Sequence, residues 1–208
     1  MVVDPSAPLS PADDPTLPVG APTNPSVDGY EPSLLNIAGG QLTIAATKGI
    51  MFSELGLSTE TNSSVNHLGV AFDANLAQPY DIETEMVDLP AVGTDNSFHQ
   101  GGLWFGLDEA NHVKLVAIRD GNAGYRVQLA YEENDLSGNN NNLVEENSPV
   151  VLNTGDDVIL RMTVDPTANT VAGFYSLDGG ANFTQVGAGP ITVGAALFQG
   201  ITLPDASG

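Results

Sequence analysis

The chain has 208 residues, of which 26 are Asp or Glu and only five are Lys or Arg, so its formal net charge is −21. Such a surface repels nucleic acids and anionic membranes, which excludes both as partners. The absence of cysteine excludes disulfides and thiol chemistry. No run of 18 apolar residues occurs, so the sequence predicts no membrane insertion.

The first 26 residues hold seven of the 14 prolines, separated by Ser, Thr, Asp and Ala. A segment of this composition buries too little apolar area to order itself, so residues 1–26 are predicted to be a disordered, Pro-rich linker. Residues 27–208 are predicted to form one domain. The N-terminus has no basic stretch followed by an apolar core, so no signal peptide is predicted. We expect the chain to be a segment of a larger secreted or cell-surface polypeptide, with other domains of that polypeptide as partners.

Beyond residue 30 the sequence alternates in short segments that are typical of β-strands. No long amphipathic helix is predicted, and residues 194–200 fit either one helical turn or a strand. Residues 132–148, which include Asn139–Asn142, are predicted to be a loop. The predicted strands are residues 34–37, 41–46, 50–52, 68–72, 80–89, 102–107, 112–119, 125–131, 157–164, 170–176 and 183–186. Many short strands with turn residues between them favour an all-β fold, an antiparallel β-sandwich.

The central part of the sandwich is predicted at residues 100–127, which read as a meander of strands with short polar turns. Along residues 102–107, Leu103 and Phe105 alternate with glycines and with Trp104, the only tryptophan. Because side chains alternate between the two faces of a strand, Trp104 is predicted to point away from Leu103, Phe105 and Leu107. The ring then lies on the outer face of a sheet.

Several strings in this region and later in the chain resemble the concanavalin A-like jelly rolls appended to bacterial glycoside hydrolases, most closely the β-xylosidase C-terminal type. The resemblance covers about residues 34–200. It lies in the strings GGL (101–103), DEAN (108–111), VKL (113–115), AGGQLTI (38–44), VILRMTV (158–164) and VAGFYSLDGGANF (171–183). It implies two curved antiparallel sheets, a sugar-binding or accessory role without catalysis, and often a structural calcium. The family usually closes with one further strand, whereas this sequence stops at Gly208.

A carbohydrate site is predicted around Trp104, because an indole offers a sugar ring an apolar face and an N–H donor. Lys114, Arg126, Gln128 and His99 are the predicted donors to sugar hydroxyls. Two alternatives stay open. Trp104 fits a core position equally well, and basic residues on strands of so acidic a chain favour pairing with carboxylates over contact with a ligand.

Clustered carboxylates and amides would select calcium, which prefers oxygen ligands. The candidate ligands are Asp108, Asn111 and Asp135, in the turn at residues 108–111 and the loop at residues 135–142. No twelve-residue EF-hand pattern occurs. Calcium is therefore expected as a structural ion and not as a catalytic one.

Catalysis is not predicted. Glu83 and Glu85 superficially resemble the carboxylate pair of a glycosidase, but alternating acids on a strand are typical of its solvated face. The string SLDGGANF (176–183) matches the Asp-box pattern and is predicted to be a structural hairpin turn. The sequence thus favours a non-catalytic carbohydrate-binding module of an extracellular protein. The alternative is a structural or adhesion spacer domain that binds no ligand.

Overall fold

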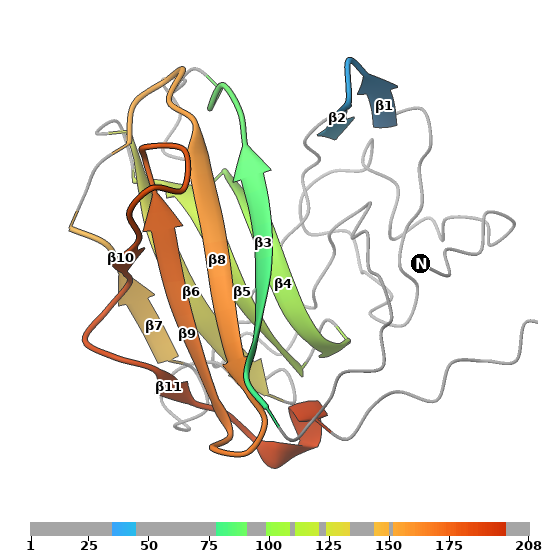
Figure 1. Ribbon diagram of the computed structural model, residues 1–208, viewed down its shortest axis with the longest axis vertical. Helices are drawn as coiled ribbons and strands as arrows, with labels where there is room; N and C mark the ends of the chain where they lie inside the picture. The colour runs from blue at the N-terminus through green and yellow to red at the C-terminus, as the bar shows by residue number, and fades with distance from the viewer. Residues whose placement is uncertain are drawn as a thin grey trace, which may run out of the picture. The chain divides into compact units, whose positions relative to one another are not determined.

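Alternating apolar and polar residues form antiparallel β-strands through most of the described part of the chain in the computed structural model (Figure 1). The structure describes residues 35–44, 78–90, 99–108, 111–120, 124–133, 144–149 and 152–198. The chain divides into two compact units, Met1–Ala74 with Asp135–Asn140, and Asn75–Asn134 with Asn141–Gly208. The predicted linker at residues 1–26 and the predicted strands at residues 50–52 and 68–72 lie outside the described residues.

In the first unit, the structure describes a β-hairpin, as the sequence predicts. Strand β1 (Leu35–Ala38) pairs with β2 (Gln41–Ile44) in antiparallel register. The two turn residues, Gly39 and Gly40, have φ angles of 60° and 80°. A two-residue turn with both φ angles positive matches the right-handed twist of the strands, and glycine adopts it without steric cost.

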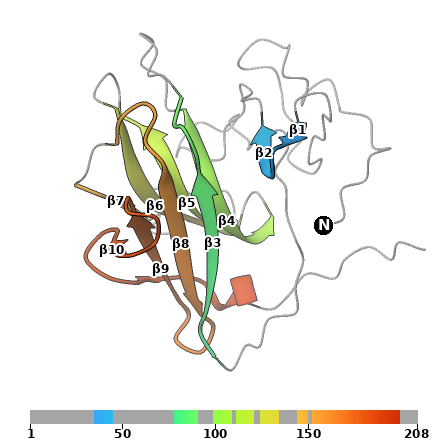
Figure 2. The same ribbon diagram turned by 45° about the horizontal axis from the view of Figure 1, so that its top comes forward.

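The second unit contains two antiparallel sheets that lie face to face (Figures 1 and 2). One sheet has the simplest connectivity, because each strand pairs with the next along the chain. Its strands are β4 (Gln100–Asp108), β5 (Asn111–Arg119), β6 (Tyr125–Glu133) and β7 (Val144–Asn147). This order is the meander that the sequence predicts for residues 100–127, extended by one strand.

The facing sheet has the order β10-β9-β8-β3, and β11 also pairs with β9. Its strands are β3 (Tyr80–Met86), β8 (Val158–Asp165), β9 (Thr170–Ser176), β10 (Thr184–Gln185) and β11 (Ile191–Thr192). Along β3 the partly buried and exposed residues alternate without a break. Ile82, Thr84 and Met86 therefore face the core and Glu83 and Glu85 face outward, as predicted.

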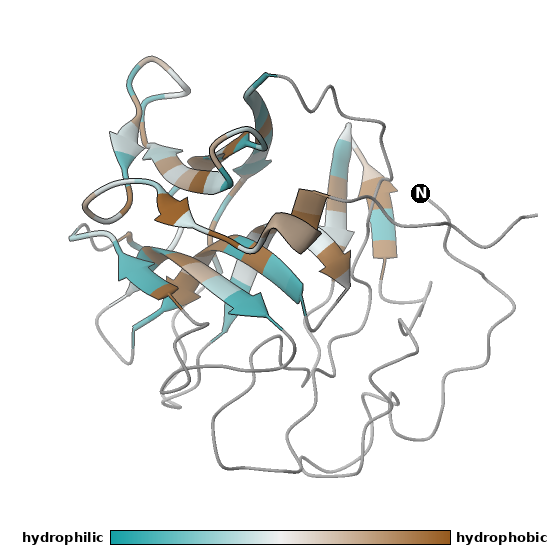
Figure 3. Cartoon of the chain, turned by 90° about the horizontal axis from the view of Figure 1, so that it is seen from below, coloured by the Kyte–Doolittle hydropathy of each residue, from teal (hydrophilic) through white to brown (hydrophobic). Residues whose placement is uncertain are grey.

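The hydrophobic core lies between the two sheets, and the strands are accordingly banded apolar and polar (Figure 3). Leu115 and Leu129 of one sheet and Leu160 and Met162 of the other are completely buried. At Gly173 the sheets pack tightly, since a Cβ atom added there would lie 2.8 Å from Leu115 Cδ1. A larger residue at this position would push the layers apart.

Three elements differ from the sequence prediction. Strand β6 continues to Glu133, two residues beyond its predicted end, and β7 lies inside the predicted loop at residues 132–148. Strand β11 was not predicted. For residues 194–200 the structure selects the helical alternative, because Ala195–Phe198 form a 3₁₀ helix that buries Leu197 and Phe198. The second unit is thus an all-β sandwich of antiparallel sheets.

Candidate functional site

Trp104 lies on the outer face of the β4–β7 sheet, the face that points away from the core. Its strand neighbours Leu103, Phe105 and Leu107 pack against the core cluster, whereas Trp104 does not belong to that cluster. In the β4–β5 register Trp104 lies opposite Lys114. Directly opposed residues of antiparallel strands share a face, so Trp104 and Lys114 lie on the same side of the sheet. This placement agrees with the alternation in the sequence.

Two glycines flank Trp104 on the same strand. A Cβ atom added at Gly102 would lie 2.8 Å from Val116 Cα, and one added at Gly106 would lie 2.6 Å from His112 Cα. Because both contacts are with the β5 backbone, neither position accepts a side chain without moving the strand. The Trp104 ring therefore has no side chains at the next positions along its own strand on either side.

The outer face of the β4–β7 sheet holds an unusual number of buried polar residues. His112 and Glu132 are each 1% exposed, Lys114 is 3% exposed and Gln128 is 8% exposed. His112 lies directly opposite Glu132, and Lys114 opposite Ala130. Buried charges are rare in proteins unless they are paired, so each of these charged side chains is expected to depend on its partners.

Lys114 is the centre of this group. Burial lowers the pKa of Lys114 to about 8, and the carboxylates of Glu132 and Glu145 act in the opposite direction and favour its charged form. The loss of solvation is thus only partly offset by the two carboxylates. Lys114 remains mostly protonated at neutral pH, with its charge balanced by acids of β6 and β7.

Gln128 and its neighbours on β7 form a hydrogen-bonded cluster. The Gln128 amide donates from Nε2 to Glu145 Oε1 at 2.8 Å and to Asn147 Oδ1 at 3.3 Å. Asn147 Nδ2 donates to the same Glu145 oxygen at 3.1 Å. The donor hydrogens of Gln128 are therefore already used within the protein.

Arg126 lies toward the other end of the same face, opposite Ile118. Its guanidinium forms an ion pair with Asp120, and the two side chains are 34% and 41% exposed. Arg126 is thus the most accessible of the predicted donors on the outer face of the β4–β7 sheet. Between Arg126 and Trp104 lie Val116 and Ile118, which are apolar and buried, with 6% and 7% exposure.

His99 does not share this face. It precedes β4, and its carbonyl oxygen accepts a hydrogen bond from Arg119 N at 2.8 Å, which continues the β4–β5 ladder by one residue. Positions 99 and 104 differ by an odd number, so strand alternation places His99 on the opposite side from Trp104. His99 is exposed, but the structure does not bring it together with Trp104, Lys114 or Gln128.

Of the three predicted calcium ligands, Asp108 and Asn111 lie on described strands, at the ends of β4 and β5 that the turn joins. Asp108 and Asn111 face each other in register across the β4–β5 turn, next to a register shift between Gly106 and Asp108. Asp135 lies outside the described residues. Within the part of the chain that the structure describes, no group of three or more His, Cys, Asp or Glu residues could hold a metal ion.

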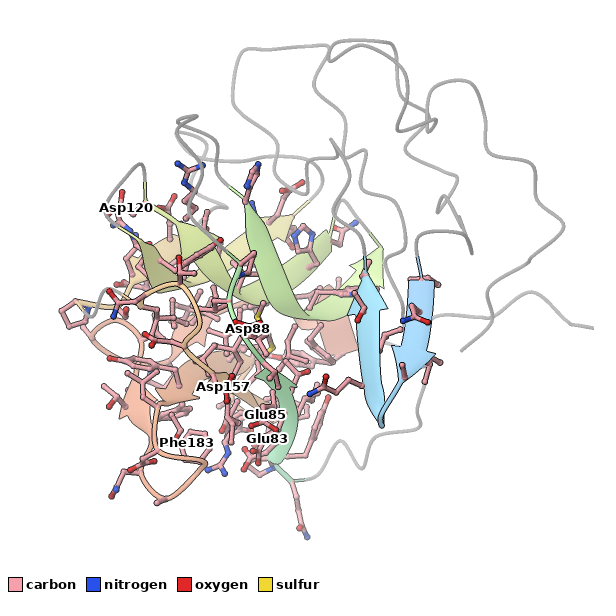
Figure 4. The ribbon with its side chains drawn as sticks, turned by 90° about the horizontal axis from the view of Figure 1, so that it is seen from above. Glu83, Glu85, Asp88, Asp120, Asp157 and Phe183 are labelled. Atoms are coloured by element: carbon pink, nitrogen blue, oxygen red, sulfur yellow. The ribbon has the colours of Figure 1, made fainter. Side chains whose placement is uncertain are left out.

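The outer face of the other sheet is an ordinary solvated surface. Arg161 on β8 donates to Glu83 Oε1 from Nε at 3.1 Å and from a terminal nitrogen at 3.0 Å. The same guanidinium lies 3.6 Å from the ring centroid of Phe183, and Glu83 and Glu85 project from β3 toward this side (Figure 4). Glu83 is thus committed to a salt bridge, as expected for a solvated strand face.

The Asp-box string forms a structural turn, as predicted. Asp178 accepts hydrogen bonds from Ser176 Oγ at 2.7 Å, from Asn182 N at 2.9 Å and from Asn182 Nδ2 at 2.7 Å. These hydrogen bonds lower the pKa of Asp178 to about 2, with Asn182 contributing most. Gly179 and Gly180 have φ angles of 69° and 87°. The turn folds Phe183 back onto Arg161.

Sequence reasoning missed the acids that balance Lys114. Glu132 was assigned to a loop, although it continues the spacing of two from Arg126 and Gln128 along the strand. That periodicity is the signal that could have identified it. Glu145 gave no such signal, because it lies on the short strand β7 that follows the Asn-rich segment.

No family model, curated protein or solved structure matches this chain. The resemblance to concanavalin A-like modules therefore rests on the strings quoted above. Among the described residues, no helix is long and apolar enough to cross a membrane.

Proposed function

We propose that this chain is a non-catalytic carbohydrate-binding module of a larger secreted or cell-surface protein, and that its sandwich is a concanavalin A-like jelly roll. Two observations support the fold type: two antiparallel sheets face each other, and one of them is a four-stranded meander. The strings shared with that family extend over both sheets. Sugar binding is the role that this resemblance implies.

The observation that carries the proposal is the placement of Trp104. Trp104 is partly exposed, lies outside the core cluster and has a glycine two positions away on each side along its strand. A partly exposed aromatic ring can stack on a pyranose. Lys114 and Gln128 lie on the same face but are 3% and 8% exposed, so we expect them to support this face without donating directly to the ligand.

The carboxylates support a role without catalysis. Glu83 is paired with Arg161, and Glu85 is exposed on the same strand. On the outer face of the β4–β7 sheet, Glu145 accepts hydrogen bonds from Gln128 and Asn147. A glycosidase needs one carboxyl group that is free to donate a proton and a second that acts on the sugar or on water. Glu83 and Glu145 instead hold protein side chains in place.

The test is a glycan array with and without calcium, followed by titration calorimetry of Trp104→Ala with the best ligand. We expect the variant to lose glycan binding and to lose less than about 1.5 kcal/mol of unfolding free energy, as for a partly exposed site. The control is Phe105→Ala, the next residue on the strand. Its ring packs against Tyr80 and Phe198 in the core, so we expect a loss of about 3 kcal/mol with glycan affinity retained.

One outcome of these experiments would favour the alternative of a structural spacer domain that binds no ligand. If no glycan binds and Trp104→Ala costs about 3–5 kcal/mol, then Trp104 is a packing residue and the ligand-free alternative holds. An effect of calcium on the array would indicate ligands beyond the described residues. An array unaffected by chelation would remove the ion from the proposal.

A further inference from the structure

A short segment near the end of the described chain, residues 191–198, connects the two sheets of the sandwich and is named the clasp. Its first part, β11, pairs with β9 of one sheet, and Val193 N donates to Asn169 O at 3.0 Å. The next residue reaches the other sheet, because Gly194 N donates to the Tyr131 hydroxyl on β6 at 2.8 Å. In Figure 1 the clasp runs from β11 to the red helix below the strand ends.

Gly194 fits closely against β6. A Cβ atom added there would lie 2.9 Å from Tyr131 Oη and 3.1 Å from Glu133 Cδ. Tyr131 itself is 4% exposed and belongs to the core cluster. A buried hydroxyl on a regular strand is therefore the hydrogen-bond acceptor that holds the clasp to the β4–β7 sheet.

The last residues of the clasp cover one end of the hydrophobic core. Leu197 and Phe198, on the 3₁₀ helix, are 5% and 8% exposed. The Phe198 ring centroid lies 6.0 Å from that of Phe105 on β4, and the Phe105 centroid lies 6.3 Å from that of Tyr80 on β3. The clasp thus places two apolar side chains where aromatic rings of both sheets meet.

The backbone of the clasp is held much less firmly than the central strands. β11 has two residue pairs with β9, whereas β5 and β6 share nine. The preceding residues Ala188 and Pro190 are exposed, and a Cβ atom added at Gly189 between them would meet no described atom within 4 Å. Segments with few backbone hydrogen bonds open at a lower free energy than the whole domain.

We propose that the clasp opens as a unit while the two sheets stay folded, and that opening uncovers the rings of Phe105 and Tyr80. Residues 188–190 are the hinge, and Tyr131 is the positioning residue that favours the closed state. An apolar ligand that binds the uncovered rings would shift the population toward the open state, because it binds that state alone. The inference does not depend on sugar binding.

The chain has no cysteine, so a single introduced thiol can report opening through its labelling rate. Three leucines allow a matched series in the whole chain: Leu197→Cys in the clasp, Leu129→Cys in the core and Leu177→Cys at a site that is 49% exposed. We expect labelling at position 197 to be at least about 100-fold faster than at position 129 and at least about 10-fold slower than at position 177. Low denaturant should accelerate labelling at position 129 far more than at position 197, because local opening exposes little surface.

The decisive variant is Tyr131→Phe in the Leu197→Cys protein, which removes the acceptor of the Gly194 amide. We expect labelling about five-fold faster, the effect of losing one hydrogen bond. The matched control is Tyr125→Phe, also on β6 and 3% exposed, whose hydroxyl donates to Pro90 O at 3.1 Å away from the clasp. It should leave the labelling rate unchanged.

A change in the hinge should act in the opposite direction. Gly189→Ala is expected to slow labelling at position 197 about two-fold, because alanine restricts the open segment more than glycine does. Because Leu197→Cys itself weakens the clasp, hydrogen exchange of the wild-type protein provides an independent measurement. We expect the amides of residues 191–198 to exchange at least about 100-fold faster than those of β5 and β6.

The possible results separate the parts of the proposal. Equal labelling rates at positions 197 and 129, or equal exchange of the clasp and the β5–β6 amides, would show that the clasp opens only when the whole sandwich unfolds. Labelling at position 197 as fast as at position 177 would show that the clasp is not closed in solution. Either result would overturn the inference. Equal effects of Tyr131→Phe and Tyr125→Phe would overturn the role of Tyr131.

Discussion

The two outer faces of the sandwich use charge in opposite ways. On the β3–β8–β9 face, Arg161 is 30% exposed and pairs with Glu83, which is 43% exposed. On the β4–β7 face, Lys114 and Glu132 are 3% and 1% exposed. A pair in water gains little and is replaced easily by hydration, whereas a buried group depends on its partners. The same residue types thus form exposed, weakly stabilising ion pairs on the β3–β8–β9 face and buried charges that depend on their partners on the β4–β7 face.

The largest expected effect comes from removing the buried cation. Lys114→Met keeps the aliphatic stem and leaves the Glu132 carboxylate buried without the ammonium group. We expect a loss of about 3–5 kcal/mol in the free energy of unfolding, measured by denaturant titration followed by circular dichroism. The double variant Lys114→Met/Glu132→Gln should recover most of that loss, since the carboxylate that the ammonium group balanced is then replaced by a neutral amide.

A small loss in the single variant, below about 1 kcal/mol, would mean that Lys114 and Glu132 do not depend on each other. The two outer faces would then be energetically alike. Failure of the double variant to recover stability would instead point to a packing role of the Glu132 side chain.

The pH dependence of the free energy of unfolding also distinguishes the buried Lys114 from the exposed charges of the other face. The pKa of Lys114 is lowered in the folded protein from 10.5 to about 8, so above pH 8 the unfolded chain binds more protons at this residue than the folded protein. Stability from this group therefore rises with pH between about 8 and 10.5, by up to about 1.4 kcal/mol per pH unit. Burial raises the pKa values of Tyr80 and Tyr131 above 10.0, and their stabilising contribution is lost only at higher pH.

Denaturant unfolding between about pH 8 and 9.5 therefore isolates the lysine. We expect a positive slope of stability against pH for the wild-type protein and a flatter curve for Lys114→Met. Arg161→Met provides the matched control, because arginine does not titrate in this range. Parallel curves for all three proteins would contradict a perturbed Lys114.

The difference between the faces also explains what the sequence could predict. Period-two alternation located β3, β4, β5, β8 and β9 and the outward position of Trp104, because alternation is a local property of a strand. The hairpin β1–β2 and the Asp-box turn followed from glycines whose positive φ angles are also local. The pairing of Arg126 with a carboxylate followed from the scarcity of bases in so acidic a chain.

Burial of the charged group on β5 and β6 was not predictable in this way. Nothing in the string around Lys114 distinguishes an exposed strand lysine from a buried one, since burial depends on contacts between distant segments. Strand β7 was missed because four residues after an Asn-rich segment carry too weak a pattern. The same limit applied to His99, whose face depends on how far the β4–β5 ladder continues beyond the assigned strand.

The smallest expected effect is the coupling between Arg161 and Glu83 on the solvated face. In a double-mutant cycle of Arg161→Met and Glu83→Gln, we expect an interaction free energy of about 0.2–1 kcal/mol, as for other exposed pairs. Arg161→Met alone should cost somewhat more than this coupling, because the guanidinium also lies over the Phe183 ring, a contact worth about 0.5–1 kcal/mol at an exposed site. High salt should reduce the coupling with Glu83, while the packing on Phe183 should persist.

A coupling above about 2 kcal/mol, unaffected by salt, would show that this face is as dependent on its charges as the face around Lys114.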